Sequence, residues 1–80
     1  MEKIKIKDLK RGALFYLIKD YEKHGENEKY LRVRGEYDKS DKKYYTERIY
    51  YDAIGNGRYM SGDTLVYCEE NKTTIFAKYI

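Results

Sequence analysis

Apolar and polar residues alternate with a period of two along most of the chain, a pattern typical of β-strands. Lysine and isoleucine alternate over residues 3–7, and aromatic and branched residues fill residues 13–19, where we expect a strand buried on both faces. No segment has a convincing helical period. The pattern predicts an edge strand over residues 3–7 and main strands over residues 13–19, 29–37, 43–51, 63–69 and 73–80.

Turn-forming residues separate the predicted strands. Gly12 closes the first turn and is free to adopt a left-handed backbone. Turns and loops are expected at residues 8–12, 20–28, 38–42, 52–57 and 71–72. This spacing predicts one all-β domain over residues 1–80, either a small antiparallel β-barrel or a strongly bent sheet. An SH3-like barrel is the first choice and an OB-like barrel the second, because barrels remove exposed sheet edges.

The composition indicates a folded chain with a thin core. Hydrophobic residues make up 41% of the 80 residues and 11 residues are tyrosines, whereas disordered chains are poor in aromatic residues. A chain of this length buries roughly 60–65% of the surface that its unfolded form exposes. A second copy of the chain or another partner could cover part of the remaining surface, so homo-oligomerisation is one expectation.

Cysteine usage and charge narrow the setting of the protein. Cys68 is the only cysteine, which excludes an internal disulfide and argues against a small secreted protein. No stretch has the apolar region of a signal peptide or the length of a membrane span, so we expect a cytoplasmic protein with no membrane partner. The net charge of +3 resides in residues 1–12, and the rest of the chain balances to zero. This basic edge can steer an anionic partner but falls short of the basic face of a duplex-DNA binder.

The sequence offers no arrangement that indicates catalysis, a metal or a cofactor. His24 is the only histidine and lies in a charged loop without a neighbouring acid–base partner, so we interpret it as a solvated residue. Cys68 alternates with Val66 and is interpreted as a small buried residue. The Gly-Asn-Gly segment at residues 55–57 is interpreted as a hairpin turn, since no phosphate-loop pattern is present. We therefore expect a protein that acts by binding and has no enzymatic activity.

The predicted strand over residues 29–37 carries the most informative side chains. Alternation places Tyr30, Arg32, Arg34 and Glu36 on one face and Leu31, Val33, Gly35 and Tyr37 on the other. Leu31 and Val33 are expected to point inward, which would leave the two arginines on an exposed face.

Two registers are open for the hairpin that joins this strand to residues 43–51. The register in which Tyr37 pairs with Tyr44 adds Tyr45 and Tyr51 to the arginine face, and a slip of one residue does not. The pairs that distinguish the two registers are Arg34–Glu47 in the first and Arg32–Arg48 in the second. Opposite charges across a strand pair are favourable and like charges unfavourable, by a few tenths to about 1 kcal/mol, so we prefer the first register.

The candidate ligand-binding residues are the arginines and tyrosines expected around this face. They are Tyr30, Arg32, Arg34, Tyr45, Arg48 and Tyr51. Arginine forks suit phosphate groups, and aromatic faces stack on bases at about 1–3 kcal/mol per base, which predicts a nucleotide or a single-stranded nucleic acid as ligand. A purely structural interpretation stays open, because tyrosine is a good strand residue and Arg34–Glu47 would be an ordinary cross-strand pair. Tyrosine and arginine also dominate protein-interface hot spots, so a protein partner is the alternative.

Three segments carry a resemblance to a known group of proteins. They are KIKDLKRG at residues 5–12, followed by Phe15, RGEYDKSDKKY at residues 34–44, and SGDTLVY at residues 61–67. The chain resembles short uncharacterised proteins of Bacteroidetes phages and mobile elements. That group has an opening KIKDLKKGD-F, a VRGEYDRSSKKY hairpin and a late KGD-x-x-V strand, in the same order over most of the chain.

This resemblance implies a setting for the protein and no reaction. Ala13 stands where the group tends to have an acid, and the loop over residues 20–28 differs. The group has no known activity from which a functional residue could be carried over. The resemblance implies an accessory protein in the cytoplasm of a host bacterial cell, acting by stoichiometric binding on a nucleotide signal or on a host defence protein.

Overall fold

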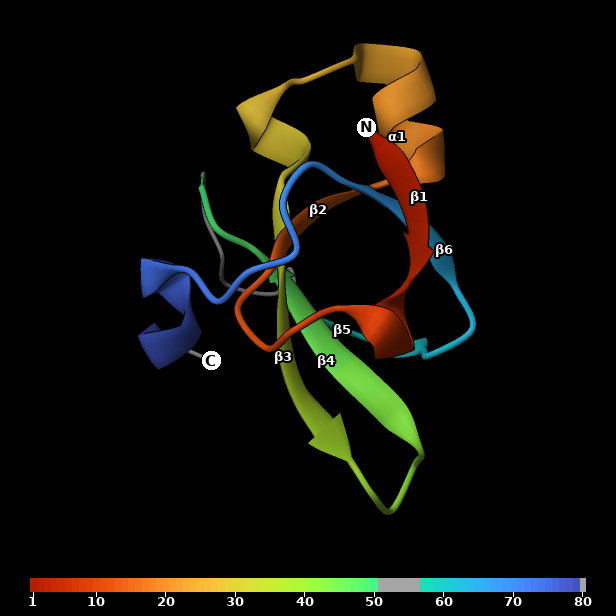
Figure 1. Cartoon of the computed structure of the whole chain (residues 1–80), viewed down its shortest axis with the longest axis vertical. Coiled ribbons are helices and arrows are strands. Elements are labelled where there is room, and N and C mark those ends of the chain that lie inside the picture. The colour runs from red at the N-terminus through yellow and green to blue at the C-terminus, as the bar shows by residue number, and fades with distance from the viewer. Residues whose placement is uncertain (51–56, 80) are drawn as a thin grey trace.

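A single antiparallel sheet of six strands forms the body of the molecule in the computed structural model, which describes residues 1–50 and 57–79. The strands are β1 (Glu2–Lys5), β2 (Leu14–Leu17), β3 (Arg32–Asp38), β4 (Lys43–Arg48), β5 (Arg58–Ser61) and β6 (Leu65–Cys68). Their order in the sheet is β1-β6-β2-β3-β4-β5. One short helix, α1 (Ile18–His24), and three 3-10 helices, η1 (Ile6–Asp8), η2 (Glu28–Tyr30) and η3 (Ile75–Tyr79), complete the described structure. Figure 1 shows the β3–β4 hairpin projecting away from α1 at the opposite end of the molecule.

The sheet is strongly bent, because β5 lies at one edge of it and yet continues into β6, next to the other edge, through residues 62–64 only. Two backbone hydrogen bonds fix η1 to this turn, from Ile6 N to Thr64 O and from Lys7 N to Gly62 O, each of 3.0 Å. No ladder joins β5 to β1 within the described residues, so the sheet does not close into a barrel. The expectation of a mostly β domain with a strongly bent sheet is confirmed, and the closed barrel is not formed.

The core lies on the concave side of this bend. Its buried members are Ile6, Leu9, Ala13, Phe15, Val66 and Cys68, with Ile4, Leu17, Tyr44 and Met60 packed against them. We call the face of the sheet that carries Phe15 the inner face, and the opposite one the outer face. Cys68 is buried as expected, and burial raises the pKa of its thiol.

The basic N-terminal strand lies where the sequence predicts it, at an edge of the sheet. Lys3 and Lys5 of β1 are exposed, and a lysine-rich edge resists unwanted pairing with another sheet. Lys7 Nζ lies 3.2 Å and Lys5 Nζ 3.9 Å from a carboxylate oxygen of Asp63, and Lys3 Nζ lies 5.6 Å from the centre of the Tyr67 ring. Part of the expected basic character is therefore neutralised within the molecule.

The polar loop predicted over residues 20–28 is wrong, because α1 occupies most of it. This helix has only seven residues, which is too short for a helical period to stand out in the sequence. It ends at Gly25, which has φ +66° and donates its N–H to Tyr21 O at 2.7 Å. Tyr21 packs the helix on the sheet through ring contacts with Tyr16 and Tyr67 at 5.7 Å and 4.8 Å between centres.

The final strand predicted over residues 73–80 is also wrong. Residues 75–79 form η3, and Ile80 lies outside the described residues. A strand that was not predicted, β5, instead completes the sheet beside β4. The C-terminal segment is held by Thr74, whose N–H and hydroxyl both donate to Gly12 O, at 3.1 Å and 2.7 Å. The turn expected at residues 52–57 falls largely outside the described residues.

Candidate functional site

The register of the β3–β4 hairpin combines both of the registers considered from the sequence. Tyr37 pairs with Tyr44, as preferred, but the register shifts between Arg34 and Tyr37. Beyond this bulge Arg34 lies opposite Thr46, and the arginine pair Arg32–Arg48 forms. The Arg34–Glu47 pair is not formed, because the bulge takes up one residue of β3 and moves every later pair by one position.

The arginines of β3 lie on the inner face, so the prediction of an exposed arginine face is wrong. Arg32 lies opposite Phe15, and Val33 lies opposite Leu14. Arg32 is 4% exposed and Val33 is 1% exposed, so both faces of this strand are covered. The residues of η3 contact β3 as well. Alternation indicates two faces correctly here but does not tell which one meets the core.

Three arginines from three neighbouring strands gather on the inner face. Arg32 of β3 lies directly opposite Arg48 of β4, and Thr46 of β4 lies opposite Arg58 of β5. Arg34 lies opposite Thr46 and points to the same face as Arg32, two residues further along β3. We call Arg32, Arg48 and Arg58 the arginine cluster. Arg58 was missed from the sequence because no strand was predicted around it, although its alternation with Met60 was visible.

Thr46 sits at the centre of the cluster and is fully buried. Its hydroxyl accepts a hydrogen bond from Arg32 Nη1 at 3.3 Å and donates one to Arg58 O at 3.2 Å. Both bonds connect strands, since Arg32 belongs to β3 and Arg58 to β5. The hydroxyl therefore fixes the position of the Arg32 guanidinium between the two other arginines.

Replacing Thr46 with valine is expected to lower the free energy of unfolding by about 1–3 kcal/mol, because a buried donor and a buried acceptor lose their partner while the side-chain volume is kept. Chemical denaturation measures the change. Thr73→Val is the control, since its hydroxyl also donates to a backbone carbonyl, Arg11 O at 2.8 Å, but from an exposed position. Equal losses in the two variants would contradict the role given to Thr46.

The cluster concentrates positive charge in a partly dehydrated place. Burial lowers the pKa of Arg32, and the charges of Arg58 and Arg48 lower it further, while Asp20 acts against them. Neither Arg48 nor Arg58 has a carboxylate oxygen within 4.0 Å among residues 1–50 and 57–79. The Nε atom of Arg48 is buried, and no acceptor in the described part of the chain bonds to it. Like charges held together in this way favour the binding of an anion.

The tyrosines near the arginines already have ring partners. Arg48 lies over the ring of Tyr30, 5.1 Å from its centre, and His24 stacks on the same ring at 4.2 Å with planes 4° apart. Arg34 lies over Tyr44 at 4.4 Å. His24 is exposed as expected, but it contacts Tyr30 rather than solvent alone. Tyr30 thus orients Arg48 and offers little open ring surface for a base.

Of the other two tyrosines of the predicted site, only Tyr45 lies within the described residues, and it does not join the arginines. Tyr45 alternates with Thr46 and so lies on the outer face, where its hydroxyl donates to Glu47 Oε2 at 2.9 Å. Burial and this bond to Glu47 raise the pKa of Tyr45. Tyr51 lies outside the described residues. The structure therefore brings together Tyr30, Arg32 and Arg48 from the predicted set. It places Arg34 on the same face but over Tyr44, and Tyr45 on the opposite face.

A tyrosine-lined pocket of about 530 Å³ lies at the β3–β4 hairpin, where Tyr45 and Tyr59 of the outer face and Tyr37, which packs on Tyr44, line it. The ring of Tyr45 meets that of Tyr59 edge-on, with centres 5.2 Å apart. Tyr59 is 54% exposed and Tyr37, on the same rim, is 43% exposed. Large aromatic side chains so exposed are suited to contact another protein.

No helix among the described residues is long and apolar enough to cross a membrane. Within the same residues, no three or more histidine, cysteine, aspartate or glutamate side chains are grouped so as to hold a metal ion. No protein-family model, no curated protein and no solved structure matches the chain.

Proposed function

We propose that the protein is a non-catalytic module that binds a phosphate-bearing ligand, a nucleotide or a single-stranded nucleic acid, at the arginine cluster. The observation that carries this proposal is the direct opposition of Arg32 and Arg48 on the inner face with Arg58 beside them. Like charges directly opposite on neighbouring strands destabilise a sheet. A bound phosphate, with two negative charges, would convert this repulsion into attraction.

The three arginines differ in exposure in a way that suits this role. Arg32 is buried and held by Thr46, Arg48 is half-buried against Tyr30, and Arg58 is exposed. Arg32 would thus supply a fixed charge at the base of the site, and the other two would supply guanidinium donors that reach the ligand. Planar guanidinium forks match the oxygens of a phosphate group. Because the Tyr30 ring is occupied, the proposal favours recognition of the phosphate over stacking on a base.

The test is the double variant Arg48→Gln with Arg58→Gln, titrated with pyrophosphate, ATP and a short single-stranded oligonucleotide. We expect affinity to fall about tenfold or more, which corresponds to about 1.4 kcal/mol or more. In the unaltered protein, ligand at about a hundredfold its Kd adds about 2.7 kcal/mol to the free energy of unfolding. That gain should raise the Tm by roughly 10–20 °C in a domain of this size. Calorimetric titration and thermal melts measure both effects.

Lys23→Gln with Lys39→Gln is the matched control, because it removes the same charge from two exposed positions outside the cluster. This control should keep both the affinity and the ligand-induced rise in Tm. Without ligand, the arginine variant should be as stable as the original or slightly more stable, since it relieves repulsion around Arg32. If the arginine variant and the lysine variant lost binding equally, the loss would follow from the lower net charge alone, and the proposed site would be contradicted.

A second candidate function is inhibition or assembly of a host protein through the tyrosine-lined pocket at the β3–β4 hairpin. The exposed rings of Tyr37 and Tyr59 favour it, because buried tyrosines anchor many protein interfaces. Salt separates the two candidates. Binding of a phosphate chain weakens steeply as salt rises, whereas an interface anchored by tyrosines responds much less. The sequence resemblance gives either function the same context, an accessory protein of a phage or mobile element.

A further inference from the structure

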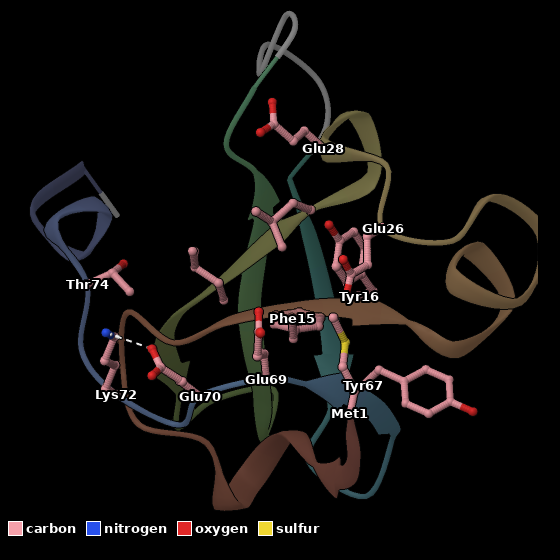
Figure 2. Close-up of a pocket in the computed structure, with 12 residues that line it drawn as sticks. Met1, Phe15, Tyr16, Glu26, Glu28, Tyr67, Glu69, Glu70, Lys72 and Thr74 are labelled. Carbon is pink, nitrogen blue, oxygen red and sulfur yellow. Dashed lines mark ion pairs between the residues drawn. The ribbon is translucent and has the colours of Figure 1, made fainter.

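A second hollow lies on the outer face of the sheet, away from the arginine cluster. Strand β2 directs Phe15 to the inner face with Arg32, and Leu14 and Tyr16 to the outer face. Leu14 and Tyr16 contribute to a pocket of about 280 Å³ that also takes in Leu31 of the segment before β3. Figure 2 shows this pocket with the residues that line it. Phe15 contributes to its lining as well, and no residue of the arginine cluster does.

The rim of this pocket is strongly acidic. Four glutamates line it, Glu26, Glu28, Glu69 and Glu70. Figure 2 shows Glu28 and Glu26 in the upper half of the view, Glu69 and Glu70 in the lower half, and Tyr16 beside Glu26. Lys72 is the basic side chain of the lining, and it is engaged by Glu70, with Nζ 2.7 Å from Oε2. In the part of the chain that the structure describes, no cationic nitrogen lies within 4.0 Å of the other three carboxylates.

Tyr16 provides an independent sign that the pocket is built for a ligand. Its side chain lines the pocket and is only 6% exposed, and its ring packs on that of Tyr21 at 5.7 Å. The hydroxyl makes no hydrogen bond with any residue of the described ranges, and it is not among the fully buried polar atoms, so it is accessible from the pocket that the side chain lines. Burial raises the pKa of Tyr16, and the charges of Glu26 and Glu28 raise it further. The charges of Glu26, Glu28 and Glu69 thus act on a hydroxyl at the wall of the pocket that has no hydrogen-bond partner among the described residues.

We propose that this pocket binds the primary ammonium group of an aliphatic cation. The apolar side chains of Met1, Leu14 and Leu31 would cover the methylene stem. Carboxylates on opposite sides suit an ammonium, which carries three donors that point in different directions. A guanidinium instead prefers one carboxylate in a flat fork and an open aromatic face, and the ring of Tyr16 is packed against Tyr21. The pocket volume of about 280 Å³ lies close to the lower limit of the volumes of ligand pockets, which range from about 300 to 1,000 Å³.

Two sources present this chemistry, a free polyamine and the lysine side chain of a partner protein. Spermidine and Nα-acetyl-lysine methylamide stand for them in the test, and Nα-acetyl-arginine methylamide probes the choice of ammonium over guanidinium. Calorimetric titration of the whole chain measures the affinity for each probe. It is carried out at about 0.15 M salt, because salt at this concentration screens attraction between distant exposed charges. Tighter binding of spermidine identifies the free cation as the source, and tighter binding of the lysine derivative identifies a side chain.

The variant Glu26→Gln with Glu69→Gln removes one carboxylate from each side of the pocket. We expect it to weaken binding of the ammonium ligand about tenfold or more, since charge-assisted hydrogen bonds are lost on both sides. Tyr16→Phe keeps the ring and should weaken binding severalfold with little change in Tm. Glu22→Gln with Asp41→Asn is the control of equal charge, because both residues are exposed and neither lines the pocket.

Three results would overturn the proposal. They are the absence of saturable binding of both ammonium probes, equal affinity of the pocket variant and its control, and tighter binding of the arginine derivative. The variant Arg48→Gln with Arg58→Gln should bind the ammonium probe as the original does. A failure at the arginine cluster is therefore distinguishable from a failure at this pocket.

Discussion

Replacing Gly12 with alanine is expected to lower the free energy of unfolding by about 3 kcal/mol or more, from backbone strain and overpacking together. Gly12 has φ +88°, and a Cβ atom there would lie 2.7 Å from the Cβ of Ala77 and 3.2 Å from the backbone N of Thr74. Its own backbone is held on both sides, because its N–H donates to Arg34 O at 2.8 Å and its carbonyl accepts from Thr74. The chain therefore cannot relieve the clash without releasing the C-terminal segment. Urea denaturation measures the loss.

Gly25→Ala separates the two causes of this effect. Gly25 also has a positive φ of +66°, but nothing lies within 4 Å of the position that its Cβ would occupy. The alanine there should cost only the backbone strain, about 1–3 kcal/mol. If both variants lose the same stability, close packing between Gly12 and the C-terminal segment is not the reason for the glycine. The whole free energy of unfolding of a domain of this size is only about 4–12 kcal/mol, so the loss caused by either substitution is readily measured.

Gly12 also illustrates what could be predicted from the sequence. A turn ending in a left-handed glycine follows from local chemistry, and the structure has that turn. Period-two alternation likewise predicted strands that overlap five of the six found, β1, β2, β3, β4 and β6. Both signals depend on neighbours along the chain. What the glycine packs against depends on Thr74 and Ala77, more than sixty residues away, and no local pattern contains that information.

The orientation of β3 was mispredicted for a related reason. Hydrophobicity predicts Leu31 and Val33 in the core, and charge predicts Arg32 and Arg34 in solvent. The strand is covered on both faces, since Arg32 and Val33 on its two faces are both buried, so hydrophobicity does not select the inner face. The cross-strand rule for like charges failed at the bulge as well. A bulge adds one residue to one strand, and no pairing energy reveals it in advance.

The missed elements are short and depend on tertiary contacts. The helix α1 has two turns, and isolated helices of that length are not stable in water, so its formation relies on packing through Tyr21. The strand β5 has four residues and is fixed by its ladder with β4. Arg58 belongs to that strand, which is why sequence reasoning found Arg32, Arg34 and Arg48 but not the third member of the arginine cluster.

The second large effect is expected at Arg32, where the substitution chosen should decide the outcome. Arg32→Ala removes a long side chain that is 4% exposed and leaves a cavity beside Phe15, together with a Thr46 hydroxyl that loses its donor. We expect the free energy of unfolding to fall by about 2–4 kcal/mol, in line with other buried truncations. Equilibrium denaturation of the variant measures the fall.

Arg32→Met keeps most of the volume of the stem and removes the charge. Burial and the neighbouring charges of Arg58 and Arg48 lower the pKa of Arg32, which means that the folded protein disfavours its charged form. An apolar side chain of similar size removes the repulsion between Arg32 and the like charge directly opposite it, Arg48. We therefore expect Arg32→Met to lose less stability than Arg32→Ala, since it keeps most of the volume, although both variants lose the bond to Thr46. We also expect it to bind pyrophosphate about tenfold more weakly or worse. A methionine variant as unstable as the alanine variant would show that the guanidinium holds the fold together, and intact pyrophosphate binding in a folded methionine variant would remove Arg32 from the proposed site.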